Sequence, residues 1–378
     1  MAARAIETEP ETETAPGTVP GTVPATEAWG GWADARVPVI RRRPSEDDPS
    51  RWATRVIAGR TYRIALPITF TPYAAVAACS ARCRFCSENL RIEGETAAAR
   101  LRPGADYFDA LAAALAQLRG LPLSYSLSGL ETTDDHDACL QLLRTLRGAE
   151  RDGVTVHERV LYTNGAGFAA EGGEALADAF LAFGLSWAEL SRHHHCTDRN
   201  QAIMRFRPGQ AVGSEQGFAT AAARLRARVP LRLVCIVQRG GIEDAVGVAA
   251  YLQWARAQGA ETVIFREFSR LDPRYRDNAT RRYTDAARVP VERLLADCLH
   301  SPLHDALTPE AATDGYYFRN LRLRHRDGMC VVFEASDYAH MHRRHASGAL
   351  YKLVFHANGR LCAGWSPDRD VLWEYGHD

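Results

Sequence analysis

Lysine is almost absent from this chain of 378 residues. Lys352 is the only lysine, so 45 of the 46 basic residues are arginine, and 46 acidic residues balance them to a formal net charge of zero. Because nonspecific binding to nucleic acid depends on surplus positive charge, we expect no nucleic-acid partner. The arginine excess is typical of the coding bias of a genome rich in alanine and arginine codons.

Long apolar runs and a secretion signal are also lacking. No apolar run approaches membrane-spanning length, and the N-terminus has no basic segment followed by an apolar core. The nine cysteines are an odd number and do not suggest a disulfide framework. We therefore expect a cytoplasmic protein with reduced thiols and no membrane partner.

Three of the nine cysteines are close together in the chain. Cys79, Cys83 and Cys86 have the spacing C-x3-C-x2-C, and Phe85 stands just before the last. Thiolates are the ligands of iron–sulfur clusters, and a cubane [4Fe-4S] cluster takes four ligands. Three close thiolates therefore predict a cubane with one iron left for a ligand other than protein.

Zinc is the alternative metal for the same cysteines. Structural zinc sites have four protein ligands and usually come as paired C-x2-C units. The chain has no second such pair, but one histidine of the run 193–195 could supply a fourth ligand. A zinc-stabilised binding protein without catalysis thus stays open as an alternative.

The cysteine run resembles the cluster motif of the radical S-adenosylmethionine (radical SAM) enzymes. In that family the amino and carboxylate groups of S-adenosylmethionine bind the open iron. The resemblance implies that a reduced [4Fe-4S] cluster passes one electron to S-adenosylmethionine, and that the resulting 5′-deoxyadenosyl radical abstracts a hydrogen atom from the substrate. It also implies an electron donor such as flavodoxin or ferredoxin.

Strand and helix patterns alternate after residue 61. Strand patterns cover 64–73, 123–128, 159–163, 185–190, 231–238 and 262–268, and helix patterns cover 106–119, 134–153, 172–183, 215–228 and 242–258. Such alternation predicts βαβ units with a parallel sheet. Six units are fewer than the eight of a full barrel of about 250 residues. We predict an α/β fold, a partial (β/α)6 TIM-like barrel, as the resemblance also implies.

Four segments are expected along the chain. Residues 1–35, rich in Pro, Thr, Glu, Ala and Gly, are expected to be a disordered tail, and 36–60 a lead-in with a short helix after Pro49. Residues 61–270 form the barrel. Residues 271–378 are a small α+β C-terminal extension covering the barrel mouth, with a helix over 281–303 and short strands, some joined by an Asn358-Gly359 hairpin.

Polar residues follow several predicted strands, where parallel α/β folds place their sites. Ser128-Gly129-Leu130-Glu131 resembles the family's Gly-Gly-Glu-Pro run, which holds the methionyl amino group, but departs from it at Leu130 and Thr132; a plain turn is the alternative. Thr163-Asn164-Gly165, Ser191-Arg192 and Glu267 follow later strands. By resemblance the cofactor-binding residues are Ser128, Gly129, Glu131, Asn164, Ser191, Arg192 and Glu267.

The sequence contains fewer features that indicate the substrate. Arginines near the expected site favour an anionic or sugar-like molecule. We expect a small polar metabolite, with a role in specialised biosynthesis; modification of a peptide or tRNA is the alternative. No catalytic residue is certain, but Cys330 and Cys362 are candidates for a thiol that returns a hydrogen atom to the substrate, ordinary buried cysteine being the default.

Overall fold

The computed structural model describes residues 40–42, 49–73 and 75–376, so the predicted disordered tail (1–35) lies outside the described residues. Part of the predicted lead-in is described. Pro49–Arg51 is a 3-10 helix, where a short helix was expected. The strand β2 (Trp52–Ile57) then pairs antiparallel with the start of β3 (Arg60–Pro72), a hairpin that the sequence analysis did not anticipate.

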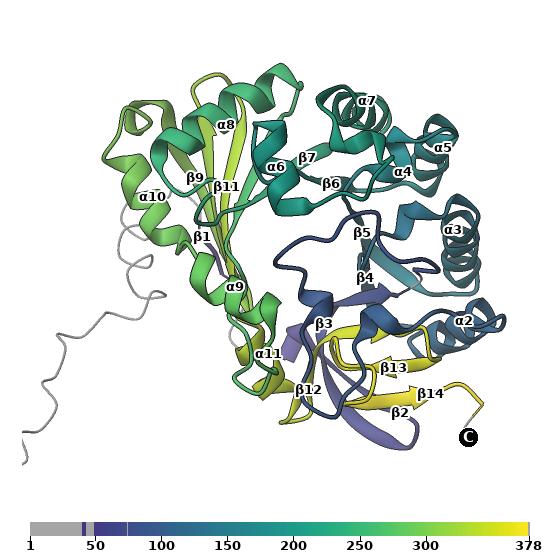
Figure 1. The fold of residues 1–378 in the computed structure, drawn as a ribbon. Helices are drawn as coiled ribbons and strands as arrows, with labels where there is room; N and C mark the ends of the chain where they lie inside the picture. Colours follow the sequence, from purple (N-terminus) through teal and green to yellow (C-terminus); the bar gives the residue numbers. More distant parts are fainter. Residues whose placement is uncertain (1–39, 43–48, 74, 377–378) are drawn as a thin grey trace, which may run out of the picture.

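Six parallel strands lie side by side in chain order, as the sequence predicted. They are β3 (Arg60–Pro72), β4 (Pro122–Leu127), β5 (Thr155–Thr163), β6 (Trp187–Ser191), β7 (Leu231–Ile236) and β8 (Thr262–Arg266). Figure 1 shows that the sheet is curved and that helices cover its outer face. These helices are α2 (Tyr107–Gln117), α3 (His136–Arg151), α5 (Gly173–Phe183), α7 (Glu215–Arg226) and α8 (Ala245–Ala257), with the shorter α4 (Ala166–Ala169) and α6 (Thr197–Met204).

Side-chain caps mark the start of three of these outer helices. Asp135, Ser214 and Asp244 each accept a hydrogen bond from a backbone N–H in the first turn of α3, α7 and α8. Such a bond satisfies one of the four N–H groups that a helix start leaves free. Asp106 occupies the N-cap position of α2, but its side chain makes no capping hydrogen bond.

Two strands of the C-terminal region extend the parallel run at both ends. β11 (Cys330–Ser336) pairs parallel with β8, and β12 (Ala349–Phe355) pairs parallel with β3. The parallel sheet thus has eight strands, not the six predicted. Among the described residues β11 and β12 do not pair with each other, so the sheet stays open. The helix α11 (Tyr338–His345) connects them and lies on the open side (Figure 1).

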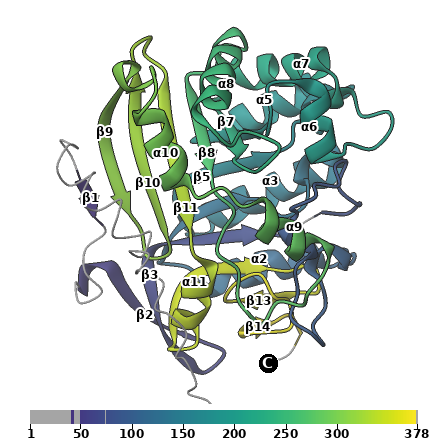
Figure 2. The same cartoon turned by 60° about the vertical axis from the view of Figure 1, so that its left-hand side comes forward.

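The remaining C-terminal strands join the same sheet as antiparallel additions. In the sheet, β10 (Phe318–His325) pairs with β11, and β9 (Leu307–Asp314) pairs with β10. At the other end, β13 (Arg360–Cys362) pairs with β12, and β14 (Val371–Glu374) pairs with β13. Figure 2 shows β13 and β14 below α2 and beside α11. The short β1 (Ile40–Arg42) pairs with β9. The antiparallel β12–β13 pair confirms the hairpin predicted from Asn358-Gly359.

The single helix predicted over 281–303 is wrong. The chain forms α9 (Ala279–Ala287) and α10 (Val291–Leu299) instead. Pro290 stands between them, and proline has no N–H for a helical hydrogen bond and disfavours the helical conformation of the residue before it. Within the described ranges no helix combines the length and the apolar character needed to cross a bilayer.

Candidate functional site

The cysteine loop, residues 75–86, starts directly after the carboxyl end of β3. Its main chain is hydrogen-bonded to the segment 203–207, which comprises the end of α6 and the residues just after it. The N–H groups of Arg82 and Arg84 donate to carbonyl oxygens of residues 203–205 at 3.0–3.2 Å, and the N–H of Arg207 donates to Ser80 O at 2.9 Å. The Arg207 side chain also donates to the Cys79 carbonyl at 2.7 Å. The path of the loop is therefore fixed mainly by hydrogen bonds of its own main chain.

The three thiols of this loop are free and partly buried. Burial raises the pKa of Cys79 and of Cys86 to about 12 and that of Cys83 well above its usual value, and each thiolate would also repel its neighbours. Three thiolates here need a strongly positive partner, which an iron–sulfur cluster supplies.

Hydrogen-bond donors point at the sulfur atoms as well. Cys79 Sγ accepts from Ala81 N at 3.4 Å and from Asn164 Nδ2 at 3.6 Å. Donors of this kind tune the potential of iron–sulfur clusters. By residue type and spacing, the three thiols fit a cluster held by three thiolates. In the described part of the chain, however, no three His, Cys, Asp or Glu side chains, these cysteines included, are grouped so that they could hold one metal ion.

Glu131 joins the carboxyl ends of β4 and β5. Its buried carboxylate accepts hydrogen bonds from Thr133 Oγ1 at 2.6 Å, Thr163 Oγ1 at 2.8 Å and Asn164 N at 2.6 Å. Burial, followed by the charge of Asp134, raises the pKa of Glu131 to about 7. The carboxylate thus fixes the relative position of two strand ends.

The same strand ends hold the cysteine loop. Ser80 N donates to Asp134 Oδ2 at 2.6 Å, and Asn164 Nδ2 donates to Ser80 Oγ at 2.9 Å. Through these contacts the structure brings Glu131 and Asn164 close to the cysteine loop, and their contact with S-adenosylmethionine stays a prediction. Asp134 was not singled out from the sequence, because an Asp next to a turn carries no signal of a contact with a residue 54 positions earlier.

Gly129 lies against the aromatic ring of Tyr73, the residue after β3. Its φ is +92°, and a Cβ at this position would come within 2.5 Å of the Tyr73 ring. Only glycine fits both the backbone conformation and the space. The neighbouring Ser128 hydroxyl lies 3.0 Å from the hydroxyl of Ser126.

We expect Glu131→Gln to lower the free energy of unfolding by about 1–3 kcal/mol. An amide has only one acceptor oxygen, so its NH₂ would face either Asn164 N–H or the two threonine hydroxyls, and one buried group would lose its partner. Chemical denaturation of both proteins measures the difference. Glu158→Gln, a change of a partly exposed carboxylate (side chain 41% exposed), is the matched control and should shift stability by less than about 0.5 kcal/mol. Equal shifts would contradict the network.

Side chains alternate along β6 and just beyond it. Arg192 is fully buried on the helix side, where its guanidinium donates to Glu215 Oε2 at 2.7 Å and lies over the ring of Phe218. Since successive residues face opposite sides of a strand, Ser191 faces the inner side of the curved sheet, away from the helices. The predicted cofactor contact of Arg192 is therefore not supported by its placement, whereas that of Ser191 is compatible with it.

His193 is the member of the histidine run that meets the cysteine loop. Its ring lies edge-on to Phe85, with the centroids 5.0 Å apart, and its Nδ1 accepts from Ile236 N at 3.0 Å. Burial, followed by the charges of Arg266 and Arg192, lowers the pKa of His193 to about 3. The neutral ring therefore carries its proton on Nε2 and can donate it in a hydrogen bond.

The alternation of side chains along a strand also determines which way Arg266 and Glu267 face at the end of β8. The Glu267 carboxylate is ion-paired with Arg288 and accepts from Val291 N, the first residue of α10, at 3.0 Å. It faces the helix layer, so the predicted contact of Glu267 with cofactor or substrate is not supported by its position. Its neighbour Arg266 faces inward and pairs with Glu189 and Glu334 at 2.9 and 2.5 Å.

The two candidate thiols lie in different places. Cys330 is the first residue of β11 and pairs with Thr262, the first residue of β8. It therefore lies at the amino end of the parallel strands, about 13 Å of strand below Glu334, and away from the cysteine loop. Cys362 is fully buried and pairs with Val354 near the carboxyl end of β12.

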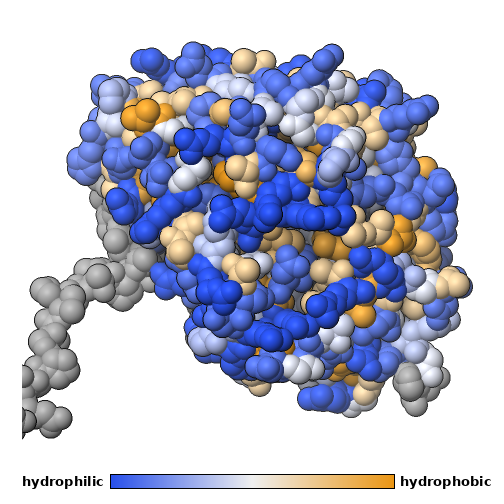
Figure 3. Space-filling model, viewed as in Figure 1, coloured by the Kyte–Doolittle hydropathy of each residue, from blue (hydrophilic) through white to orange (hydrophobic). Residues whose placement is uncertain are grey.

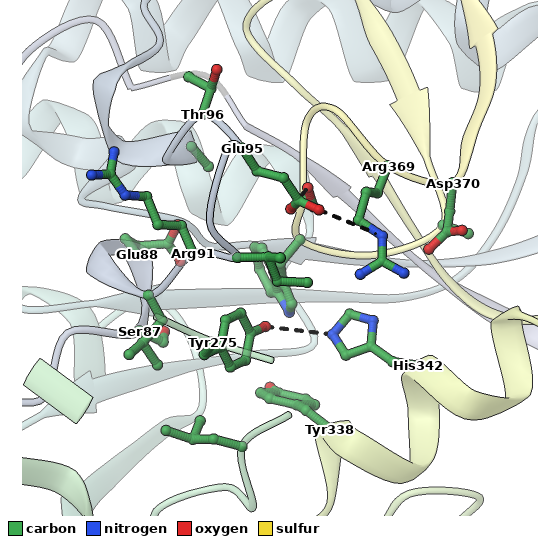
Figure 4. Close-up of a pocket in the computed structure, with 17 residues that line it drawn as sticks. Ser87, Glu88, Arg91, Glu95, Thr96, Tyr275, Tyr338, His342, Arg369 and Asp370 are labelled. Carbon is green, nitrogen blue, oxygen red and sulfur yellow. Dashed lines mark hydrogen bonds and ion pairs between the residues drawn. The ribbon is translucent and has the colours of Figure 1, made fainter. Parts of the chain in front are cut away.

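A cavity adjoins the cysteine loop on the open side of the sheet. It is enclosed by the segment after Cys86, the β8–α9 connection, α11 and the β13–β14 connection (Figure 4). Glu95 and Arg369 are paired at 3.6 Å, and Tyr275 Oη lies 3.5 Å from His342 Nε2. The space measures about 800 Å³, including a part open to solvent. Hydrophilic side chains predominate on the face shown in Figure 3.

Comparison with known proteins gives a likeness in fold alone. No protein-family model and no curated protein matches the chain. Among solved structures it resembles native anSMEcpe with bound AdoMet, at 16% identity and a TM-score of 0.39, over 53% of this chain and 51% of that chain. The present chain thus spans about half the length of that protein.

Two further solved structures are similar. Streptococcus suis SuiB bound to S-adenosylmethionine is 14% identical, with a TM-score of 0.46 over 82% of this chain and 63% of that chain. Coproporphyrinogen III oxidase (HemN) from Escherichia coli, described as a radical SAM enzyme, is 12% identical, with a TM-score of 0.41 over 68% and 66%. These values are low, so the proposals below depend on the residues of this chain.

Proposed function

We propose that this chain is a radical SAM enzyme. It would hold a [4Fe-4S] cluster on Cys79, Cys83 and Cys86 and use S-adenosylmethionine as cosubstrate. The observation that carries the proposal is the cysteine loop itself: three thiols with C-x3-C-x2-C spacing follow the first of the parallel strands, beside the polar ends of the next two.

When bound, such a cluster supplies the electron that cleaves S-adenosylmethionine to methionine and a 5′-deoxyadenosyl radical, which abstracts a hydrogen atom from the substrate. The chain's own residues position these partners. Asn164 and Asp134 hold the cysteine loop through Ser80, and Asn164 also donates to the Cys79 sulfur. Phe85 packs against His193 and Phe268, which shields one side of the loop from water.

Four more of the predicted residues are given roles in this proposal. Ser128, Gly129 and Glu131 follow β4 directly and would meet the methionyl part of S-adenosylmethionine. Ser191 and the Nε2–H of His193 face the interior and can donate hydrogen bonds to ribose hydroxyls or to the substrate.

The cavity beside the loop is the substrate site in this proposal. Its lining contains two basic residues, Arg91 and Arg369, and two acidic residues, Glu88 and Glu95. Such a lining suits a small polar metabolite, as in a biosynthetic reaction. A one-electron donor such as flavodoxin or ferredoxin would be the protein partner.

Anaerobic reconstitution with iron and sulfide tests the proposal. We expect about four iron and four sulfide per chain, the broad visible absorption of an iron–sulfur cluster, and formation of 5′-deoxyadenosine from S-adenosylmethionine with dithionite. The full chain with zinc alone is the comparison. A chain that takes up one zinc ion but no iron–sulfur cluster, or that forms a cluster without yielding 5′-deoxyadenosine, would overturn the proposal in favour of a non-catalytic metal-binding protein.

A further inference from the structure

A second hollow lies on the outer side of the molecule. It is bounded by α8, by the segment 301–306 after α10 and by the end of β10, and we call it the α8 groove. It measures about 1000 Å³, including a part open to solvent. It shares no residue with the cavity beside the cysteine loop, so the proposed function does not account for it.

The α8 groove has apolar side chains on two sides. The helix α8 contributes Val246, Ala249 and Leu252, and the facing segment contributes Pro302 and Leu303. Val246 is 78% exposed, the largest exposed fraction among the exposed large hydrophobic side chains of the described residues. A single exposed valine is ordinary, but two apolar walls that face each other form a surface whose removal from water is favourable.

The start of the described chain is directed toward this groove. β1 pairs parallel with β9, and Ile40 lies opposite Ala312 (Figure 2). Because the two strands run in the same direction, the chain that precedes Ile40 is directed along β9 toward its first residue, Leu307. Ala306, which lines the α8 groove, comes directly before Leu307. The pairing thus leads from the N-terminal segment to the groove.

The length of the preceding segment is sufficient to reach the groove. Trp32 is eight positions before Ile40, and Ala306 is six positions before Ala312. At about 3.3 Å per residue, eight extended residues span about 26 Å and six residues of strand about 20 Å. Trp32 can therefore reach the level of Ala306 with length left for a sideways step, and Trp29 can reach about 10 Å further.

Two tryptophans stand out in this segment. Trp29 and Trp32 are the only aromatic residues among residues 1–39, and Gly30 and Gly31 separate them. Each indole can bury a large apolar area, about 150–250 Å². Glycine permits backbone conformations that other residues avoid, so both indoles can turn to the same side. The segment has the apolar groups that the α8 groove would cover.

The charges of the two partners are complementary. Glu27 and Asp34 flank the tryptophans. Arg256 and Arg326 line the α8 groove, and Arg256 is ion-paired with Asp327. Within the described residues the guanidinium of Arg326 has no ion pair. It can pair with an acidic residue of the segment or lie over an indole ring, which attracts a cation.

We propose that the segment containing Trp29 and Trp32 docks into the α8 groove of its own chain. The indoles would cover the apolar walls formed by Val246 and Leu303, and the segment would continue from the groove into β1. Docking would join the start of the chain to the C-terminal strands at a surface separate from the cysteine loop.

Limited digestion of the full chain with trypsin tests this proposal. The bond after Arg36 lies between the tryptophans and β1, whereas the bond after Arg4 lies far before them and serves as the internal reference. We expect cleavage after Arg36 to be at least about tenfold slower in the wild type than in Trp29→Ala/Trp32→Ala, because cleavage follows the fraction of released segment. Cleavage after Arg4 should be equal in both proteins. Mass spectrometry of the released peptides measures both rates.

Ala249→Arg tests the groove itself. It places a long charged side chain in one wall of the groove and should speed cleavage after Arg36 as the tryptophan variant does. Ala112→Arg, at an exposed position of α2, is the matched control and should keep the wild-type rate. If Ala249→Arg unfolds at a lower temperature than Ala112→Arg, the exposed Val246 on the same wall is changed instead, in Val246→Asp.

Three results would overturn the proposal. Equal rates after Arg36 in the wild type and the tryptophan variant would show that the tryptophans do not hold the segment. Slow cleavage that persists in both Ala249→Arg and Val246→Asp would place the segment on another surface. Protection that increases with protein concentration, together with dimers in sedimentation, would place it on a second copy of the chain.

Discussion

Cys83→Ser is expected to reduce 5′-deoxyadenosine formation to the level of a blank without protein. Cys83 lies between the other two thiols of the loop, and serine is a poor ligand for iron compared with a thiolate. With two thiolates left, the reconstituted chain should hold well below the wild-type amount of iron and sulfide. Iron analysis, the visible spectrum and chromatography of the reaction mixture measure these three quantities.

Cys196→Ser is the matched control for this experiment. Cys196 is exposed, lies at the start of α6 and makes no contact with the cysteine loop in the described structure. This variant should keep the wild-type iron content and the wild-type amount of 5′-deoxyadenosine. Retention of the cluster in Cys83→Ser, or equal loss in both variants, would show that the loop does not provide the ligands.

The second large effect is expected for Arg266→Met. Arg266 faces the inner side of the curved sheet and pairs with Glu189, whose side chain is 5% exposed, and with Glu334. Removing the guanidinium leaves two carboxylates close together with little access to water. Breaking a buried ion pair on one side is strongly destabilising, and we expect a loss of about 2–4 kcal/mol in the free energy of unfolding, measured by denaturant titration.

Arg324→Met provides the comparison on the surface. Arg324 pairs with Glu310 at 2.7 Å, but its side chain is 46% exposed. Exposed ion pairs contribute about 0–1 kcal/mol, so this variant should remain close to the wild type. A triple variant that also carries Glu189→Leu and Glu334→Leu should recover part of the stability lost in Arg266→Met. A loss in Arg266→Met no larger than in Arg324→Met would contradict the interior network.

Hydrophobic periodicity predicted the parallel strands and outer helices well, because buried strands and amphipathic helices leave a repeating pattern. The helix break at Pro290 could have been predicted too, since proline ends helices; the run of apolar residues on both sides obscured it. The pairing of β11 and β12 could not, because a strand pattern does not name its partner. For that reason six parallel strands were expected where eight are present.

Polar residues at the strand ends could be located from the sequence, but the side of the sheet that each side chain faces could not. Strand ends were identified correctly, yet neighbouring polar residues there face opposite sides. The sequence analysis assigned both Ser191 and Arg192 to the cofactor, although the Arg192 side chain faces the helices. Of Arg266 and Glu267 it assigned Glu267, whose side chain also faces the helices. A shift of one residue along a strand moves a side chain to the opposite face of the sheet. Strand boundaries predicted from sequence are in error by more than one residue, so they do not fix the face.

The parallel pairing of β3 with β12 has a consequence for the order of events on the ribosome. β3 is made early and is the strand that leads into the cysteine loop, whereas β12 is almost the last strand of the chain. Contacts between such distant segments form late and slowly. During synthesis one edge of β3 stays without this partner, and the cavity lacks the part of its wall that Ala363 and Trp365 provide. The cavity beside the cysteine loop can therefore be complete only after the last strands, β12 to β14, have been made.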